Sequence, residues 1–295
     1  MSFLQNALSQ HGTLGPSLNL SYSLFPFLYD TCSRMDSLSR LVRSALATDQ
    51  SRTMTLPAFD EAYPAYSLGL GKEPRIDPWM GYIRSLYPLI GRTADLCDQV
   101  KAANSNSPSI ITQAESLKGE IEAWNPDPTI LLRLNGYTMD LEPGNDITNM
   151  AEAYRYATLL YLHQVVPEIF ETSTQQLAQS IFAGLRAIPS NSRIAIIQTY
   201  PLVMAGCEAC RIEDREWVKE RWTAMMTRTN LKNIDNCLKI TQEVWKRRDS
   251  YRGGRQKVDI QPRFGSFGDI NEKNDPEFTV KDTFHWASAM KDLGF

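Results

Sequence analysis

The chain has 295 residues, of which 42% are hydrophobic, enough to bury the core of one large domain or two small ones. Its 31 basic and 34 acidic residues leave a net charge of -3, which gives no general attraction to nucleic acid or anionic lipid. The five cysteines are irregularly spaced, no secretory leader is recognisable, and no apolar run approaches the roughly 18 residues that span a membrane. We therefore expect a nuclear or cytoplasmic protein with no membrane span and no direct binding to nucleic acid.

Apolar residues recur at spacings of three and four along most of the chain, which predicts an all-α fold of about nine helices in a single large bundle. The first clear apolar stripe lies in residues 81–103, where Pro88 should kink the helix or end its first piece. Ser109 can cap the next helix, which should end before the proline-rich residues 125–128.

The same periodicity continues through the second half of the chain. One long helix is predicted over residues 146–166, and Pro167 should end it. Ser192 can cap another helix, and two more are predicted over residues 214–227 and 233–249. No stretch alternates between apolar and polar residues for long enough to predict a strand.

Two segments lack this periodicity. Residues 53–78 are rich in proline, glycine and tyrosine, and residues 253–276 mix glycine, proline and asparagine with isolated aromatics. Both are longer than the usual connection, and such segments are either disordered or serve as lids and ligand-facing loops. We divide the chain into residues 1–74, a helical segment with a loop, and residues 75–295, the main helical domain against which the first part packs.

A C-x-x-C pair, Cys207 and Cys210, stands in the sequence MAGCEACRIEDREWVKERW. Two thiolates make only half of a structural zinc site, which needs four ligands, and a thioredoxin-type pair would have to follow a strand. The remaining cysteines and the histidines are scattered: Cys32, Cys97, Cys237, His11, His163 and His285. We therefore expect Cys207 and Cys210 to be ordinary small residues, buried or half-buried, and we expect no metal or other cofactor.

The chain is rich in side chains that build apolar sites, with 6 tryptophans, 12 tyrosines and 10 methionines. Such residues could line a pocket between helices, although core packing explains most of them equally well. The candidate pocket-lining residues are Tyr156, Leu160, Met204, Trp222, Met225 and Trp245.

Two paired acids and one basic cluster raise the alternative of a site for magnesium and a diphosphate. Asp95 and Asp98 lie three residues apart on one helix face and could share a magnesium ion, although a solvated helix face is the more common explanation. Residues 245–257 are strongly basic and could be a nuclear signal, a diphosphate-binding patch, or cations that complement the dipole at a helix C-terminus.

The sequence PLVMAGCEACRIEDREWVKERWTAMM, followed after a short gap by ITQEVWKRRD, closely resembles the fungal-specific transcription factor domain. This is the regulatory domain that follows the binuclear zinc cluster in many fungal regulators. The likeness continues, in the right order, through IDPWMGYIRSLYPLIGRTADLCDQV, SPSIITQAESLKGEIEAW, AEAYRYATLLYLHQVVPE and the terminal HWASAMKDLGF.

The resemblance implies an all-helical regulatory domain, of a family in which some members sense a small apolar molecule. The chain departs from the full regulators in one respect, because a binuclear cluster needs six closely spaced cysteines and the five here are scattered. It therefore cannot bind DNA by the family's usual means. We expect either the regulatory part of a longer protein or a free-standing relative.

The predicted function is that of a regulatory domain that binds an apolar small molecule or a partner protein between its helices. Transcriptional co-regulators are the expected partners, and a homodimer is possible. The alternative is a magnesium-dependent enzyme like a class I terpene (sesquiterpene) cyclase, acting on an isoprenyl diphosphate in a dry aromatic cavity. In that case Asp95 and Asp98 would hold magnesium, and the diphosphate would meet Arg92, Lys246 and Arg247.

Overall fold

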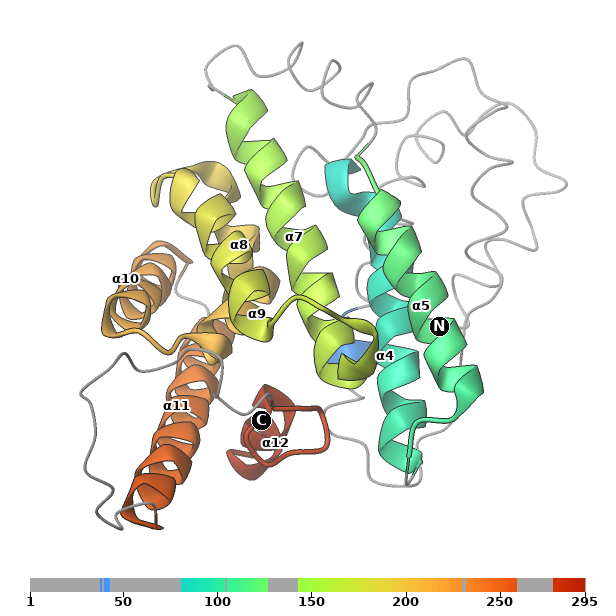
Figure 1. Ribbon diagram of the computed structural model, residues 1–295. Helices are drawn as coiled ribbons and strands as arrows, with labels where there is room; N and C mark the ends of the chain where they lie inside the picture. Colours follow the sequence, from blue (N-terminus) through green and yellow to red (C-terminus); the bar gives the residue numbers. More distant parts are fainter. Residues whose placement is uncertain are drawn as a thin grey trace, which may run out of the picture.

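Figure 1 shows the computed structural model, which describes residues 38, 40–42, 81–103, 105–126, 143–229, 232–258 and 278–294. Throughout these ranges the regular structure is helical and no strand occurs, so the all-α prediction is confirmed. The elements in chain order are η1 (Gly81–Leu86), α4 (Tyr87–Ala102), α5 (Pro108–Ala123), α7 (Pro143–Val165), η2 (Pro167–Ile169), α8 (Thr174–Ala187), η3 (Arg193–Gln198), α9 (Thr199–Glu208), α10 (Ile212–Thr229), α11 (Lys232–Val258) and α12 (Trp286–Asp292).

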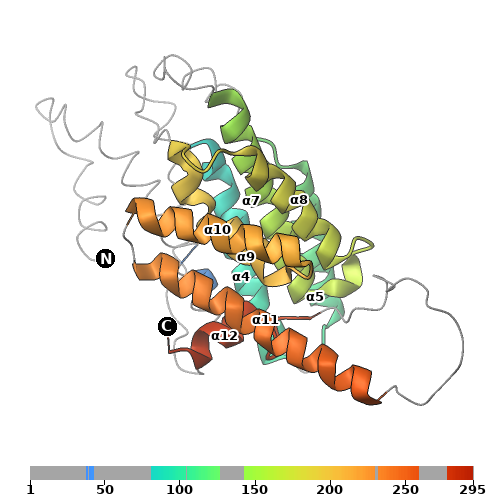
Figure 2. The same ribbon diagram turned by 90° about the vertical axis from the view of Figure 1, so that its left-hand side faces the viewer.

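Helix α7 occupies the centre of the bundle. It contacts α4 and α5 on one side and α8 and α9 on the other (Figure 1). Helices α10 and α11 pack against each other and against α9, and the C-terminal end of α11 extends beyond the other described helices (Figure 2). Among the described helices, none is both long and apolar enough to cross a membrane. One continuous hydrophobic core runs through the bundle.

Prolines set several helix boundaries as predicted. The 3-10 helix η1 gives way to α4 just before Pro88, which lies in the first turn of α4. Helix α7 ends at Val165, and the short η2 begins at Pro167. A proline is tolerated in a first turn because the amide hydrogen it lacks has no partner there.

The cap of α5 differs from the prediction. Ser107, rather than Ser109, is the N-cap, and its hydroxyl oxygen accepts a hydrogen bond from the amide of Ile110 at 3.3 Å. Pro108 takes the first helical position, where its fixed φ angle is already helical, and this moves the helix start two residues earlier.

Two further boundaries also differ. Ser192 precedes η3 but makes no capping hydrogen bond, because its hydroxyl donates to Asp146 at 2.8 Å instead. Helix α11 continues through residues 253–258, which were predicted to be irregular.

The N-terminal part of the chain joins the same core where it is described. Leu41 is buried in the core, and the guanidinium of Arg40 lies 3.0 Å from the carboxylate of Asp95. The predicted loop at residues 53–78, and the division between residues 1–74 and 75–295, lie outside the described residues.

Helices α7 and α8 approach each other closely at a glycine. A Cβ atom added to Gly184 in α8 would lie 2.9 Å from the carbonyl oxygen of Asn149 in α7, and 3.6 Å from the Cβ of Ala153. The first distance is shorter than real Cβ contacts allow. The two backbones can therefore pack this closely only because the side chain is missing.

We predict that Gly184→Ala destabilises the fold by about 1–2 kcal/mol, because the backbones must move apart. Gly119 in α5 provides the matched control, since an added Cβ there meets nothing within 4 Å. Gly119→Ala should stabilise by about 0.5–1 kcal/mol through helix propensity alone. Urea unfolding of both variants measures the difference, and equal shifts of the two midpoints would contradict this account of the α7–α8 contact.

Candidate functional site

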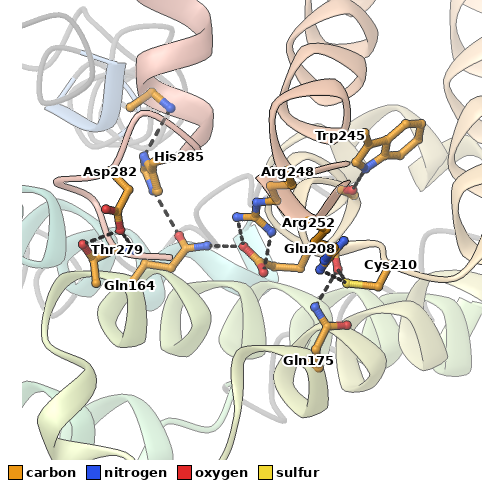
Figure 3. Close-up of polar contacts among 12 residues, drawn as sticks. Gln164, Gln175, Glu208, Cys210, Trp245, Arg248, Arg252, Thr279, Asp282 and His285 are labelled. Atoms are coloured by element: carbon orange, nitrogen blue, oxygen red, sulfur yellow. Dashed lines mark hydrogen bonds and ion pairs between the residues drawn. The ribbon is translucent and has the colours of Figure 1, made fainter. Parts of the chain in front are cut away.

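Two charged side chains meet inside the protein where α9 and α11 cross. The carboxylate of Glu208, at the end of α9, accepts two hydrogen bonds of 2.8 Å from the guanidinium of Arg248 in α11 (Figure 3). Both side chains are only 3% exposed. Bidentate hydrogen bonds between arginine and a carboxylate are among the stronger ones in proteins. This pair needs good geometry because burial has removed the water that would otherwise solvate both charges.

The pair continues into a chain of hydrogen bonds. The amide nitrogen of Gln164 in α7 donates to Glu208 at 2.8 Å, and its amide oxygen lies 3.1 Å from Nε2 of His285 (Figure 3). Nδ1 of His285 accepts from the backbone amide of Ala287 at 3.2 Å, so the ring hydrogen is on Nε2. We call Gln164, Glu208, Arg248 and His285 the polar junction. It joins α7, α9, α11 and the start of α12.

Side chains from three other helices satisfy the backbone at the end of α9. The last carbonyl oxygens of a helix have no partner within it and need one when they are buried. The donors are Gln175 to Glu208 at 2.8 Å, Trp245 to Gly206 at 2.7 Å and Arg215 to Ala209 at 2.9 Å. Helices α8, α10 and α11 are therefore all tied to the same turn.

The C-x-x-C pair lies in this turn. Cys207 is buried, and burial raises the pKa of its thiol to about 12, which leaves it an inert apolar group. Cys210 is half-buried, and its sulfur lies 3.1 Å from a guanidinium nitrogen of Arg252. The expectation of small buried or half-buried residues is confirmed for both. In the described part of the chain, no three His, Cys, Asp or Glu side chains form a group that could hold a metal ion.

The charged residues that follow the cysteines also join helices. Asp214 is buried and forms an ion pair with Arg186 of α8. The buried Arg221 donates hydrogen bonds of 2.7 Å to the carbonyl oxygens of Leu185 and Ile188, at the C-terminal end of α8. A cation at a helix C-terminus is favoured by the helix dipole as well as by these hydrogen bonds.

His285 is held neutral in this environment. Burial lowers the pKa of its imidazole well below the usual range, and the nearby positive charges of Lys101 and Arg248 lower it further. A proton on Nδ1 would also break the hydrogen bond from Ala287. Protonation of His285 and the folded polar junction are therefore incompatible.

The predicted pocket residues lie in and around the core. Tyr156 is only half-buried, and the guanidinium of Arg155 lies 4.8 Å from the centre of its ring. The other five belong to one continuous cluster: Leu160, Met204, Trp222, Met225 and Trp245. The indole of Trp245 is engaged by its hydrogen bond to Gly206. That these residues line a ligand pocket stays a prediction.

Several buried polar side chains in this region have unpaired atoms, and two of them bear on the predicted pocket. Gln198, at the end of η3, is fully buried, and neither its amide nitrogen nor its amide oxygen has a hydrogen-bond partner among the described residues. The same holds for the indole nitrogen of the fully buried Trp222 in α10. Element η3 contacts both α9 and α10. Sequence patterns give no sign of either feature, because an unpaired group is defined by its three-dimensional surroundings.

Asp95 and Asp98, the magnesium ligands of the cyclase hypothesis, lie on α4. Asp95 is partly buried beside Arg40, whose guanidinium nitrogen is 3.0 Å from its carboxylate, while Asp98 is exposed. Asp95 therefore already has a cationic partner within the protein.

The predicted diphosphate ligands are also engaged with carboxylates. Arg92 donates to the carboxylate of Glu120 through both terminal nitrogens. Lys246 and Arg247 both lie beside Glu243, at 3.5 and 2.9 Å. A bound diphosphate would have to displace these partners, and the cyclase function stays an untested prediction.

Sequence reasoning missed the polar junction itself. A signal was present, because Gln164 and Glu208 are polar residues within otherwise buried helical stretches. A buried polar residue needs a partner, but the partner of Gln164 is His285, which is 121 positions away in the chain.

Comparison with protein families gives one match. The model of the fungal specific transcription factor domain matches residues 2–295. The chain belongs to this family. The resemblance predicted from the sequence is therefore confirmed, and the sequence block that carried it is the one that ties the helices around the end of α9 in this domain. No curated protein and no solved structure matches the chain.

We predict that the domain loses stability as the pH falls below about 6.5. There the unfolded chain protonates His285 while the folded chain does not, so unfolding takes up a proton and becomes easier. Between pH 7 and pH 5.5 this should cost about 1 kcal/mol. In His285→Asn, the asparagine can still cap α12 but cannot titrate, so this contribution should vanish. Urea unfolding at both pH values measures it, and equal pH dependence in the two proteins would refute the assignment.

Proposed function

We propose that the chain is a regulatory domain of the nucleus that binds an apolar small molecule between η3, α9 and α10. Binding of this molecule changes the surface that transcriptional co-regulators contact. Membership of the transcription factor domain family supports the regulatory role. The observation that carries the ligand site is the fully buried amide of Gln198, which has no partner among the described residues.

An unpaired buried amide is costly. Leaving such a group without a hydrogen bond costs about 1–3 kcal/mol, so each case needs an explanation. The surrounding helices supply apolar and adaptable side chains, among them Met204 and Met225, which are both buried. A molecule with an apolar body and one hydroxyl or carbonyl group would satisfy the amide of Gln198 and fit this lining. The indole nitrogen of Trp222 offers a second donor.

Helix α9 connects this site with the polar junction. Gln198 directly precedes α9 and Glu208 is its last residue, so the two are about 15 Å apart along a single short helix. A ligand shifts a conformational equilibrium only by the difference in its affinity for the two states. A ligand that fixes the start of α9 would therefore favour the arrangement in which Glu208 is paired with Arg248, and with it the surface that co-regulators meet.

The test replaces Gln198 by methionine, which keeps the length and removes the amide. Without ligand, Gln198→Met should unfold at the same urea concentration as the natural protein or at a higher one, because an unpaired polar group is lost. Gln164→Met is the matched control, since both amide atoms of Gln164 are paired, and it should destabilise by about 1–3 kcal/mol.

A second experiment tests ligand binding by comparing the effects of 1-decanol and decane on thermal unfolding. The alcohol should raise the Tm of the natural protein more than the hydrocarbon does, and this difference should disappear in Gln198→Met. Equal destabilisation by the two glutamine substitutions, with no difference between alcohol and hydrocarbon, would show that the Gln198 amide is paired within the protein or with water, and would sink the proposal.

A further inference from the structure

The described C-terminal segment, residues 278–294, lies against the bundle and buries most of its apolar side chains. It ends in the short helix α12, which contacts α11 and α9. The buried apolar side chains of the segment are Phe278, Val280, Trp286, Ala287, Ala289 and Met290. We call residues 278–294 the clasp.

The clasp is held by hydrogen bonds of the kind that proteins use to bind peptides. The backbone amide of Val280 donates to the carbonyl oxygen of Gln164 at 2.9 Å, and His285 bonds the side chain of the same glutamine. Arg247 of α11 donates to the carbonyl oxygen of Thr283 at 2.8 Å. Main-chain contacts of this type provide affinity, while side-chain pockets provide specificity.

Aromatic contacts also hold the clasp against α11 and α7. Phe278 and Phe284 both contact Tyr251 of α11, with ring centroids 6.0 and 5.1 Å away. The guanidinium of Arg248 lies 4.6 Å from the ring centre of Phe278, so the clasp covers the Glu208–Arg248 pair. Trp286 lies 6.2 Å from Tyr161 of α7.

The chain that joins the clasp to α11 is much longer than the gap it has to cross. Phe278 contacts Tyr251, and α11 ends seven residues later at Val258, so the chain has to return only about 10 Å along the helix. Three or four extended residues would bridge that distance. The connection uses residues 259–277 instead. Helix–helix connections in bundles are usually about two to eight residues long, so this connection is far longer than the distance requires.

We propose that the clasp is a tethered peptide that occupies, within its own chain, a releasable docking surface on α7, α9 and α11. In trans, that surface fits a partner peptide of the same chemistry: an aromatic residue followed by a His-Trp pair that opens a short helix. A tether of this kind keeps the clasp at an effective concentration of about millimolar, so a partner must bind far more tightly or the clasp must be weakened first. The clasp therefore sets the threshold for partner binding.

The experiment uses the full chain with a protease recognition sequence inserted between Gly265 and Ser266. After cleavage, the helical circular dichroism should persist and native mass spectrometry should find the clasp still bound. A fluorescent peptide of residues 278–295 should then exchange into the cut protein with saturable anisotropy. It should bind the uncut protein at least 100-fold more weakly, because the tethered clasp competes.

The matched control is the same peptide with Trp286→Ala, which should bind the cut protein at least tenfold more weakly. Three results would overturn the proposal. They are loss of helical signal on cleavage, a cut clasp that does not exchange within a day, and equal binding of the two peptides. The first two would mean that residues 278–294 are an integral part of the core, and the third would mean that the peptide binds without the contacts of Trp286. None of these outcomes depends on the ligand site at Gln198, so the two proposals fail separately.

Discussion

The buried pair of Glu208 and Arg248 is the interaction on which the arrangement of the helices depends. Removing two charges from water costs several kcal/mol for each ion, and only good geometry with further hydrogen bonds recovers it. Here the carboxylate receives two bonds from Arg248 and one from Gln164. These bonds form only when α7, α9 and α11 are all in place. The pair therefore favours one packing of the helices among the many that a purely hydrophobic core would allow.

The residues that identify the family acquire a physical meaning in this arrangement. Glu208, Asp214, Arg215 and Arg221 each connect α9 or α10 to another helix through a buried or half-buried contact. Cys207 and Cys210 lie in the same block, and the high pKa of Cys207 argues against a role for that thiol as a metal ligand or nucleophile. The sequence block on which the family resemblance was based is thus explained by packing and hydrogen bonding between helices. Under the two proposals above, regulation acts through a shift of α9 or through release of the clasp.

Local patterns in the sequence were sufficient for the helices and insufficient for the site. The period of the apolar residues predicted α7, and Pro167 predicted its end, because both depend on near neighbours in the chain. The predicted start of α5 was wrong by two residues, because Pro108 occupies the first helical position and Ser107 before it is the cap. The polar junction was missed because its members come from distant parts of the chain. The unpaired amide of Gln198 was equally invisible, since only the folded surroundings show that it lacks a partner.

The most direct test of the central role of the pair is a double-mutant cycle on Glu208→Leu and Arg248→Met, measured by urea unfolding. Each single change leaves one buried charge without its partner and should destabilise by about 3–5 kcal/mol. The double variant removes both charges, so it should be more stable than either single variant, with a coupling energy of at least about 2 kcal/mol. Additive effects, with a coupling energy below about 0.5 kcal/mol, would contradict the account.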